Sequence, residues 1–94
     1  MRFQWNSAKA ADNLDKHGSF GEAATVFRDP LSATALDLDR SLDEERFITF
    51  GVSTSGRLLV VVHADRDDTI RIISARPVTS AERKLYEEGR PQDD

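Results

Sequence analysis

The chain of 94 residues contains no cysteine, and it has only one tryptophan, one tyrosine and three prolines. Without cysteine it can form no disulfide and offers no thiolate to a metal ion, which is typical of proteins in a reducing compartment. Its longest uninterrupted apolar run, Leu58 to Val62, is far shorter than the roughly 20 residues that cross a bilayer. The first residues show no signal-peptide pattern. We therefore expect a cytoplasmic protein that uses neither disulfides nor a membrane.

The composition favours one globular domain. Hydrophobic residues make up 38% of the chain and charged residues 32%. A chain of this size buries roughly two-thirds of its unfolded surface when it folds. Because no repeat or linker divides the sequence, we expect a single domain over residues 1–90. The polar residues 91–94 predict a disordered tail.

The charges are distributed unevenly along the chain. The overall net charge is −4, yet residues 1–45 carry −4, residues 46–84 carry +3 and residues 85–94 carry −3. The cationic middle segment places arginines at intervals between two apolar runs, within Gly56 to Arg76. The local sign of the charge decides which partner a surface attracts, so this segment indicates an anionic partner such as a nucleic acid.

Turn residues and helix-start signals divide the chain into short elements. Ser19 and Thr79 each stand three residues before a glutamate, Glu22 and Glu82, which is the capping-box spacing that begins a helix. Gly18 stands where a glycine closes the preceding helix. The predicted elements, in chain order, are a strand over Arg2–Trp5, a helix from Asn6 to about Lys16, a helix from Ser19 to Phe27, strands over Leu31–Leu38, Arg46–Ser53, Arg57–Asp65 and Thr69–Arg76, and a helix from Thr79 to about Gly89.

The order of these elements predicts the fold class. After Pro30 the apolar period changes from that of a helix to the alternation of strands, and the strands are joined by connections short enough for antiparallel hairpins. The order is β-α-α-β-β-β-β-α. It predicts an α+β fold in which helices cover one face of a mostly antiparallel sheet of four to five strands.

Strand alternation predicts which side chains share a face of the sheet. Val60 and Ile72 are expected on one face, whereas Arg57, His63 and Arg71 are expected on the other. If the helices cover the first face, the second is left as an arginine-bearing surface in adjacent strands. Such a surface can bind a phosphate group.

RNA cleavage is a reaction that these residue types can perform. Attack by the 2′-hydroxyl requires a base, an acid for the leaving 5′-oxygen, and cations for the charge that gathers on the phosphate. Arg57 and Arg76 suit the last role, because a guanidinium stays charged and binds two phosphate oxygens at once. His63 suits proton transfer, because an imidazole exchanges protons near neutral pH.

Structural interpretations of the same residues stay open. Arg57 and Arg76 can instead pair with nearby carboxylates, and His63 follows three valines, which fits a buried structural histidine. His17 fits the C-terminal cap of the first helix. His63 and Asp65 offer two metal ligands on one strand face, but no third ligand stands at a telling spacing. We therefore expect neither a metal ion nor a cofactor.

Short motifs along nearly the whole chain resemble one known family. They are Phe3-x-Trp5, Lys9, Asn13, Lys16-His17-Gly18, Phe20-x-Glu22-Ala23, Val26-Phe27-x-Asp29-Pro30, Glu44-Glu45-Arg46, Gly56-Arg57-Leu58-Leu59-x-Val61, Arg71-Ile72-Ile73-Ser74-Ala75-Arg76, Glu82-Arg83 and Tyr86-Glu87. In this order and spacing they resemble the BrnT toxins of bacterial type II toxin–antitoxin pairs. The resemblance implies a RelE-like ribonuclease fold and RNA cleavage that blocks translation. Asn6 and the pair Ala64-Asp65 depart from the family pattern, and Asp65 places an acid beside the expected RNA surface.

The strand pattern and the resemblance together define the expected site and partners. The expected site residues are Arg57, His63 and Arg76 for catalysis and Lys9, His17, Arg66 and Arg71 for RNA binding. The resemblance also implies a BrnA-type antitoxin, which we expect to be a ribbon-helix-helix dimer that carries two toxins and alone contacts operator DNA. The alternative hypothesis is a non-catalytic module that docks an acidic protein segment or DNA through its arginine face.

Overall fold

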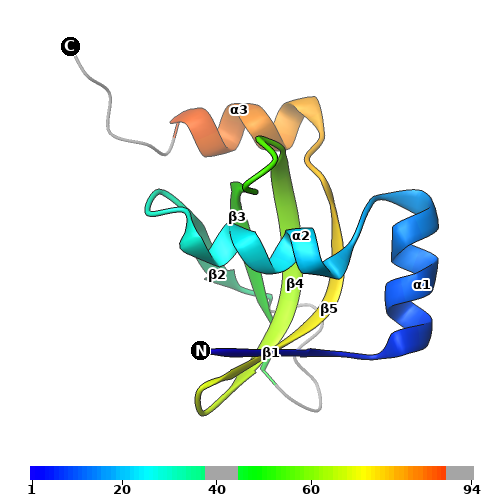
Figure 1. Cartoon of the computed structure of the whole chain (residues 1–94). Coiled ribbons are helices and arrows are strands. Elements are labelled where there is room, and N and C mark those ends of the chain that lie inside the picture. Colours follow the sequence, from blue (N-terminus) through cyan, green and yellow to red (C-terminus); the bar gives the residue numbers. More distant parts are fainter. Residues whose placement is uncertain (38–44, 89–94) are drawn as a thin grey trace.

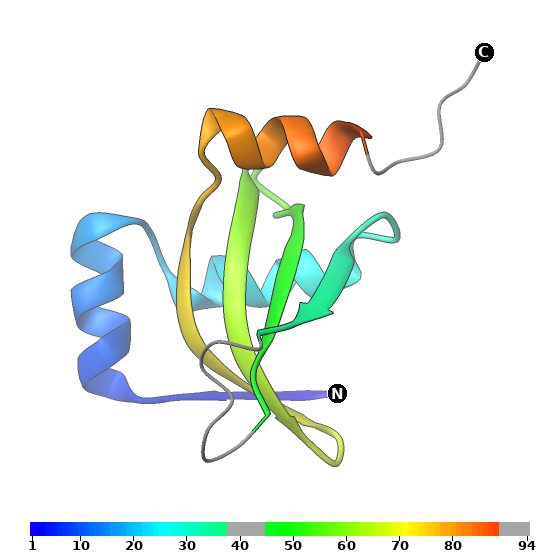
Figure 2. The same ribbon diagram turned by 180° about the vertical axis from the view of Figure 1, so that it is seen from behind.

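The computed structural model describes residues 1–37 and 45–88. Within these ranges it contains β1 (Arg2–Trp5), α1 (Ser7–Lys16), α2 (Phe20–Thr25), the 3₁₀ turn η1 (Val26–Arg28), β2 (Ala33–Leu36), β3 (Phe47–Val52), β4 (Leu58–Arg66), β5 (Thr69–Pro77) and α3 (Ser80–Glu88) (Figures 1 and 2). The predicted order of elements is confirmed. The expected end of the second strand at Leu38 and the expected tail at residues 91–94 lie outside the described residues.

The five strands form one sheet in the order β1-β5-β4-β3-β2. Strand β1 pairs with β5 in parallel, and the other neighbours pair antiparallel. Hairpins join β3 to β4 and β4 to β5, and Asp67 takes a positive φ of 56° in the second of these turns. The predicted α+β class with a mostly antiparallel sheet is therefore confirmed.

One face of the sheet, called here the core face, packs against α2 and η1. Its buried residues form a cluster with side chains of the two short helical segments, namely Leu59, Val61, Ile70, Ile72 and Ala75 with Phe20, Ala23 and Val26. Gly51 of β3 lies close to Val26, because a Cβ at this position would meet the valine side chain. Burial of this apolar surface is the main force that holds the helical segments on the sheet.

An irregularity in β5 corrects the predicted division of residues between the two faces. Val62 pairs with Ser74, but the next residue, His63, pairs with Ile72, so Ile73 is an extra residue in β5. Such a β-bulge reverses the alternation of the bulged strand beyond it. The prediction that Val60 and Ile72 share the helix-covered face is therefore wrong, because Ile72 lies on the core face with His63.

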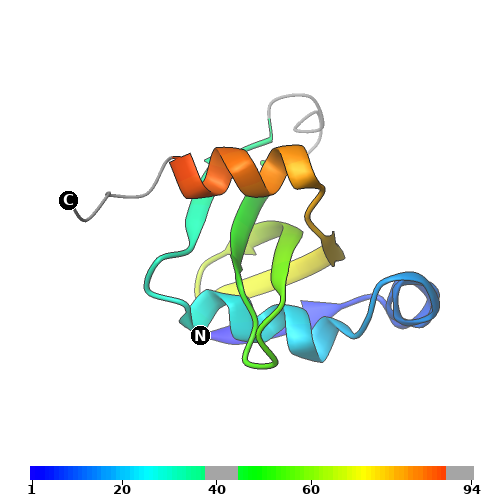
Figure 3. The ribbon, with the colours of Figure 1, turned by 90° about the horizontal axis from the view of Figure 1, so that it is seen from above.

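The opposite face, called here the open face, carries Ile48, Phe50, Val60, Val62, Ser74 and Arg76. Helix α3 lies at one end of this face, so α2 and α3 lie on opposite sides of the sheet (Figure 3). The hydroxyl of Tyr86 in α3 donates to the carbonyl oxygen of Leu31 at 3.2 Å, just before β2. The expectation that helices cover one face thus holds for α1 and α2, whereas α3 packs on the other side.

Local hydrogen bonds explain why the helices begin and end where they do. The side chain of Asn6 accepts from the backbone N–H of Lys9 at 3.1 Å, and Gly18 follows α1 with a φ of +121°. The Asn13 side chain donates to the carbonyl oxygen of Gly18 at 2.8 Å and accepts from the N–H of Ala75 at 3.2 Å. This buried amide therefore fixes the end of α1 against β5, beside the turn that leads into α2.

Candidate functional site

Arg76 and Glu82 form a bidentate ion pair at the α3 end of the sheet. The two terminal guanidinium nitrogens of Arg76, Nη1 and Nη2, donate to the two carboxylate oxygens of Glu82 at 2.7 and 2.8 Å. Glu82 also accepts from the N–H of Thr79 at 2.9 Å, and its own N–H donates to the Thr79 hydroxyl at 3.1 Å. The predicted capping box is thus confirmed, and the capping carboxylate at the same time positions an arginine.

The Arg76–Glu82 pair lines a hollow on the open face. The hollow has a volume of about 300 Å³ and is lined by Asp37, Ile48, Phe50, Val60, Val62, Ser74, Arg76 and Glu82. The side chain of Arg76 is 42% exposed and that of Glu82 is 25% exposed, so both can be reached from solvent. Hydrogen bonding to Arg76 lowers the pKa of Glu82 to about 2, and the carboxylate is therefore ionised at neutral pH. A cation and a proton acceptor stand side by side in this hollow.

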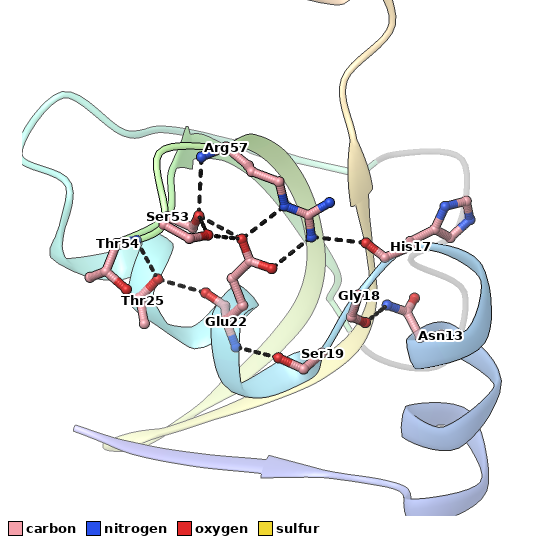
Figure 4. A network of polar contacts seen from close by, with 10 residues as sticks. Asn13, His17, Gly18, Ser19, Glu22, Thr25, Ser53, Thr54 and Arg57 are labelled. Atoms are coloured by element: carbon pink, nitrogen blue, oxygen red, sulfur yellow. Dashed lines mark hydrogen bonds and ion pairs between the residues drawn. The ribbon is translucent and has the colours of Figure 1, made fainter.

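Arg57 forms a second pair of the same kind with Glu22 at the start of α2 (Figure 4). Its Nε donates to Glu22 at 2.9 Å and its Nη2 donates to the other carboxylate oxygen at 2.6 Å. The same Nη2 donates to the backbone carbonyl of His17 at 2.9 Å. The hydroxyls of Ser53 and Ser55, in the β3–β4 turn, also donate to Glu22. Arg57 and Glu22 thus join this turn to the segment between α1 and α2.

The two arginines do not share one site. Arg57 binds Glu22 of α2 (Figure 4), and Arg76 binds Glu82 of α3. These two helices lie on opposite sides of the sheet (Figure 3). The structure also places Arg57 beside Gly18, where an added Cβ would clash with its guanidinium. The sequence hypothesis implied that Arg57 and Arg76 bind the same phosphate group. This arrangement does not bring the two side chains together to do so.

The Arg57–Glu22 pair predicts a stability change in acid. Hydrogen bonding to Arg57 lowers the pKa of Glu22 from 4.5 to about 2. A depressed carboxylate pKa adds stability that is present above the unfolded value and is lost as the pH falls through the folded one. We expect Glu22→Gln to reduce the loss of unfolding free energy between pH 5 and pH 2 by about 1–2 kcal/mol, after allowance for solvent screening. Urea unfolding across this range measures it.

A matched control for that experiment is Glu87→Gln. Glu87 has a side chain that is 60% exposed and lies 3.9 Å from its arginine partner, Arg83. Exposed pairs of this kind contribute little to stability. If Glu87→Gln and Glu22→Gln reduced the loss of unfolding free energy between pH 5 and pH 2 equally, the Arg57–Glu22 pair would not be the source of the acid sensitivity.

His63 lies in the core, and the structure does not bring it to the arginines. Its side chain is 1% exposed. The ring packs edge-on against Phe27 at 4.8 Å between centroids and stacks on Phe47 at 5.8 Å. The predicted face shared by Arg57, His63 and Arg71 is therefore not found, because His63 lies on the core face and Arg71 pairs with Ala64 on the other.

Both ring nitrogens of His63 have partners. Nδ1 lies 2.6 Å from the carboxylate of Asp65, and Nε2 lies 2.7 Å from the hydroxyl of Thr49, which in turn lies 2.7 Å from the hydroxyl of Thr34. A carboxylate only accepts, so a neutral ring donates from Nδ1 and accepts at Nε2. Proton transfer from His63 to RNA would require the ring to leave these partners.

The residues expected to bind RNA lie in three places. Arg66 and Arg71 line a hollow of about 240 Å³ beside the β4–β5 turn, together with Gln4 and the acidic residues Asp67 and Asp68. His17 is the C-cap of α1, and its backbone carbonyl, rather than its ring, contacts Arg57. Lys9 is an exposed residue of α1. The structure thus brings Arg66 and Arg71 together and leaves Lys9 on a separate element.

Glu22 and Glu82 are the site residues that the sequence reasoning missed. Each was assigned to a helix cap, because it stands three residues after a serine or threonine. Their pairing with Arg57 and Arg76 depends on tertiary contacts, which a local pattern does not contain. The available signal was the presence of both glutamates in the motifs of the resemblance.

No group of three His, Asp or Glu residues within residues 1–37 and 45–88 is arranged to hold a metal ion. Across the same part of the chain, no helix has the length and apolar character needed to span a membrane.

The fold matches a known structure. The crystal structure of the Brucella abortus ribonuclease toxin BrnT superposes with a TM-score of 0.61 at 18% sequence identity, covering 85% of this chain and 99% of that chain. The chain therefore shares the small α+β fold of that toxin.

The sequence places the chain in a family. Residues 5–82 match the profile of the family described as the ribonuclease toxin BrnT of type II toxin–antitoxin systems. This range is most of the chain, so the protein belongs to the BrnT family, and the resemblance seen in its motifs is confirmed. No curated protein matches the chain.

Proposed function

We propose that the chain is a metal-independent endoribonuclease that cleaves messenger RNA and thereby inhibits translation in the cytoplasm. The observation that carries this proposal is the Arg76–Glu82 pair, in which a cation and an ionised carboxylate share one solvent-accessible hollow. Membership in a family of ribonuclease toxins supports the reaction class. The RelE-like character of the fold is part of the same proposal.

The pair supplies two of the functions that RNA cleavage needs. Arg76 offers two donors to the oxygens of the scissile phosphate, where negative charge accumulates in the transition state. Glu82 accepts the proton of the 2′-hydroxyl, whose oxygen bonds to phosphorus as the 5′-oxygen leaves with a proton from water. When the phosphate draws Arg76 away, the main cause of the low pKa of Glu82 is removed. The carboxylate therefore becomes a stronger base when substrate binds.

Further residues extend this proposed surface along the sheet. Phe50 lines the hollow and offers an aromatic ring on which a base can stack. Arg71 pairs with Ala64, two residues beyond Val62 in β4, so the hollow of Arg66 and Arg71 follows farther along the open face. We assign these two arginines to flanking phosphates, which they bind without sequence preference.

Cleavage of a messenger RNA by the purified chain tests the proposal. We expect fragments that end in a 2′,3′-cyclic phosphate, and we expect the cleavage rate in excess chelator to equal the rate without chelator. The reaction is measured separately with and without added ribosomes. The product ends identify attack by the 2′-hydroxyl. Loss of cleavage in chelator would contradict metal independence, and salt-sensitive RNA binding without any cleavage would favour the non-catalytic binding module.

The proposed partners follow from the same family. A type II toxin has a protein antitoxin as its partner. We propose that this partner is a BrnA-type ribbon-helix-helix dimer that carries two copies of the chain. Operator DNA is then bound by the antitoxin, which fits the net charge of −4 of this chain.

A further inference from the structure

An apolar groove lies between α3 and β2, outside the proposed catalytic hollow. It has a volume of about 510 Å³ and is lined by Pro30, Leu31, Ser32, Ala33, Thr34, Ala35, Phe50, Glu82, Leu85 and Tyr86. The two alanines of β2, Ala33 and Ala35, pair with Phe50 and Ile48 of the open face, so small side chains line this part of the groove. Leu85 and Leu31 stand beside it with 70% and 48% of their surface exposed. Exposed apolar surface of this kind is typical of an interaction site.

The strand that borders the groove is an exposed edge of the sheet, as far as the described residues extend. β2 is the last strand of the described sheet, and all four of its residues are exposed. Natural edge strands usually carry charged residues or proline, which prevent pairing with another chain. Leu31 to Leu36, with the sequence LSATAL, contains neither. The edge is thus suited to accept an additional strand.

The groove is continuous with the proposed catalytic hollow. Phe50 and Glu82 line both of them. A segment seated in the groove therefore lies beside the carboxylate that holds Arg76. Continued along the open face, it would cover the hollow and exclude RNA.

We propose that the occupant is an extended segment of the antitoxin, which pairs with β2 and inserts alternate apolar side chains into the groove. This inference rests on the proposed toxin function, because the antitoxin must block the reaction that the toxin performs. Pairing with β2 supplies backbone hydrogen bonds, and the groove between the two alanines and α3 selects the side chains. Neutralisation is then direct occlusion of the Arg76–Glu82 pair.

Binding of the antitoxin to surface variants of the full chain tests this inference. We expect Leu85→Asp to raise the Kd for the cognate antitoxin by about 30-fold or more, as for a central apolar contact. Leu14→Asp is the matched control, because Leu14 is 59% exposed on α1 and lies away from the groove. It should change the Kd by less than about 3-fold. Circular dichroism checks that both variants fold.

Growth assays and hydrogen exchange separate the possible outcomes. Without antitoxin, both variants should arrest growth as the original chain does, and the antitoxin should rescue only the Leu14→Asp variant. Amides of β2 should become protected in the complex. Unchanged affinity of Leu85→Asp would overturn the proposal, as would a dimer of the chain alone that this substitution dissociates. Absence of RNA cleavage with normal antitoxin binding would refute the catalytic proposal alone.

Discussion

Alanine at Arg76 is expected to lower the rate of RNA cleavage by about 10²–10³-fold, the loss found when a donor to a developing negative charge is removed. Arg76 is half-exposed in a hollow on the open face, and its only described carboxylate partner, Glu82, is held by the helix cap. The substitution leaves the core face untouched. Single-turnover cleavage of a short RNA measures the effect, and thermal unfolding shows whether α3 stays docked.

Two further variants define what that loss means. Arg83→Ala removes a neighbouring arginine of α3 that is 54% exposed, and we expect it to cleave within a factor of about 2 of the original rate. Glu82→Gln keeps an oxygen that can accept from Thr79 but cannot take a proton. Full cleavage by both Arg76→Ala and Glu82→Gln would remove the pair from the mechanism and reduce it to a connection between β5 and α3.

The elements themselves were predictable because their signals are local. Ser19 and Thr79 start helices through hydrogen bonds that span three residues, and Gly18 ends one because its φ is positive. The strands followed from alternation and from short turns. Each of these features depends on neighbouring residues, which is why the order of elements and the fold class were predicted correctly.

The faces of the sheet were not predictable in the same way. The extra residue Ile73 in β5 reverses the alternation, so Ile72 joins His63 on the core face. The amino acids around Ile73 give no turn or glycine signal for a bulge. The face predicted by counting residues along β5 is therefore reversed on one side of the bulge. Arg71, predicted to share a face with His63, lies on the opposite face.

The two Arg–Glu pairs show a similar limit for the site. Arg57 and Glu22 are separated by 35 residues, yet they meet because α2 packs on the core face beside the β3–β4 turn. The pair connects three segments of the chain, because Arg57 binds both the Glu22 carboxylate and the backbone carbonyl of His17. Arg76, whose side chain is equally exposed at 42%, is likewise held by a carboxylate, that of Glu82, and by a backbone carbonyl, that of the adjacent Pro77, but neither of these two partners comes from a distant segment of the chain. For this reason we place the reaction at Arg76 and treat catalysis by Arg57 as a prediction still to be tested.

His63 allows a sharp test of structural against catalytic roles. We expect His63→Ala to lower the free energy of unfolding by about 3 kcal/mol, because it leaves a cavity between Phe27 and Phe47 and removes a partner of the buried Thr49 hydroxyl. Cleavage per folded molecule should stay within a factor of about 3, below the 10²-fold minimum typical of a lost acid or base. Chemical denaturation and single-turnover cleavage are to be measured on the same samples.

A double-mutant cycle with Thr49→Val completes that test. Thr49 is fully buried, and its hydroxyl lies between His63 and Thr34. If the histidine acts through this hydrogen-bond chain, the two substitutions should be non-additive in unfolding free energy by about 1 kcal/mol. Additive stability effects, together with a cleavage loss above 10²-fold in His63→Ala, would return His63 to the catalytic role predicted from its sequence position. That result would also require the ring to leave the core when RNA binds, because only 1% of its side chain is exposed in this structure.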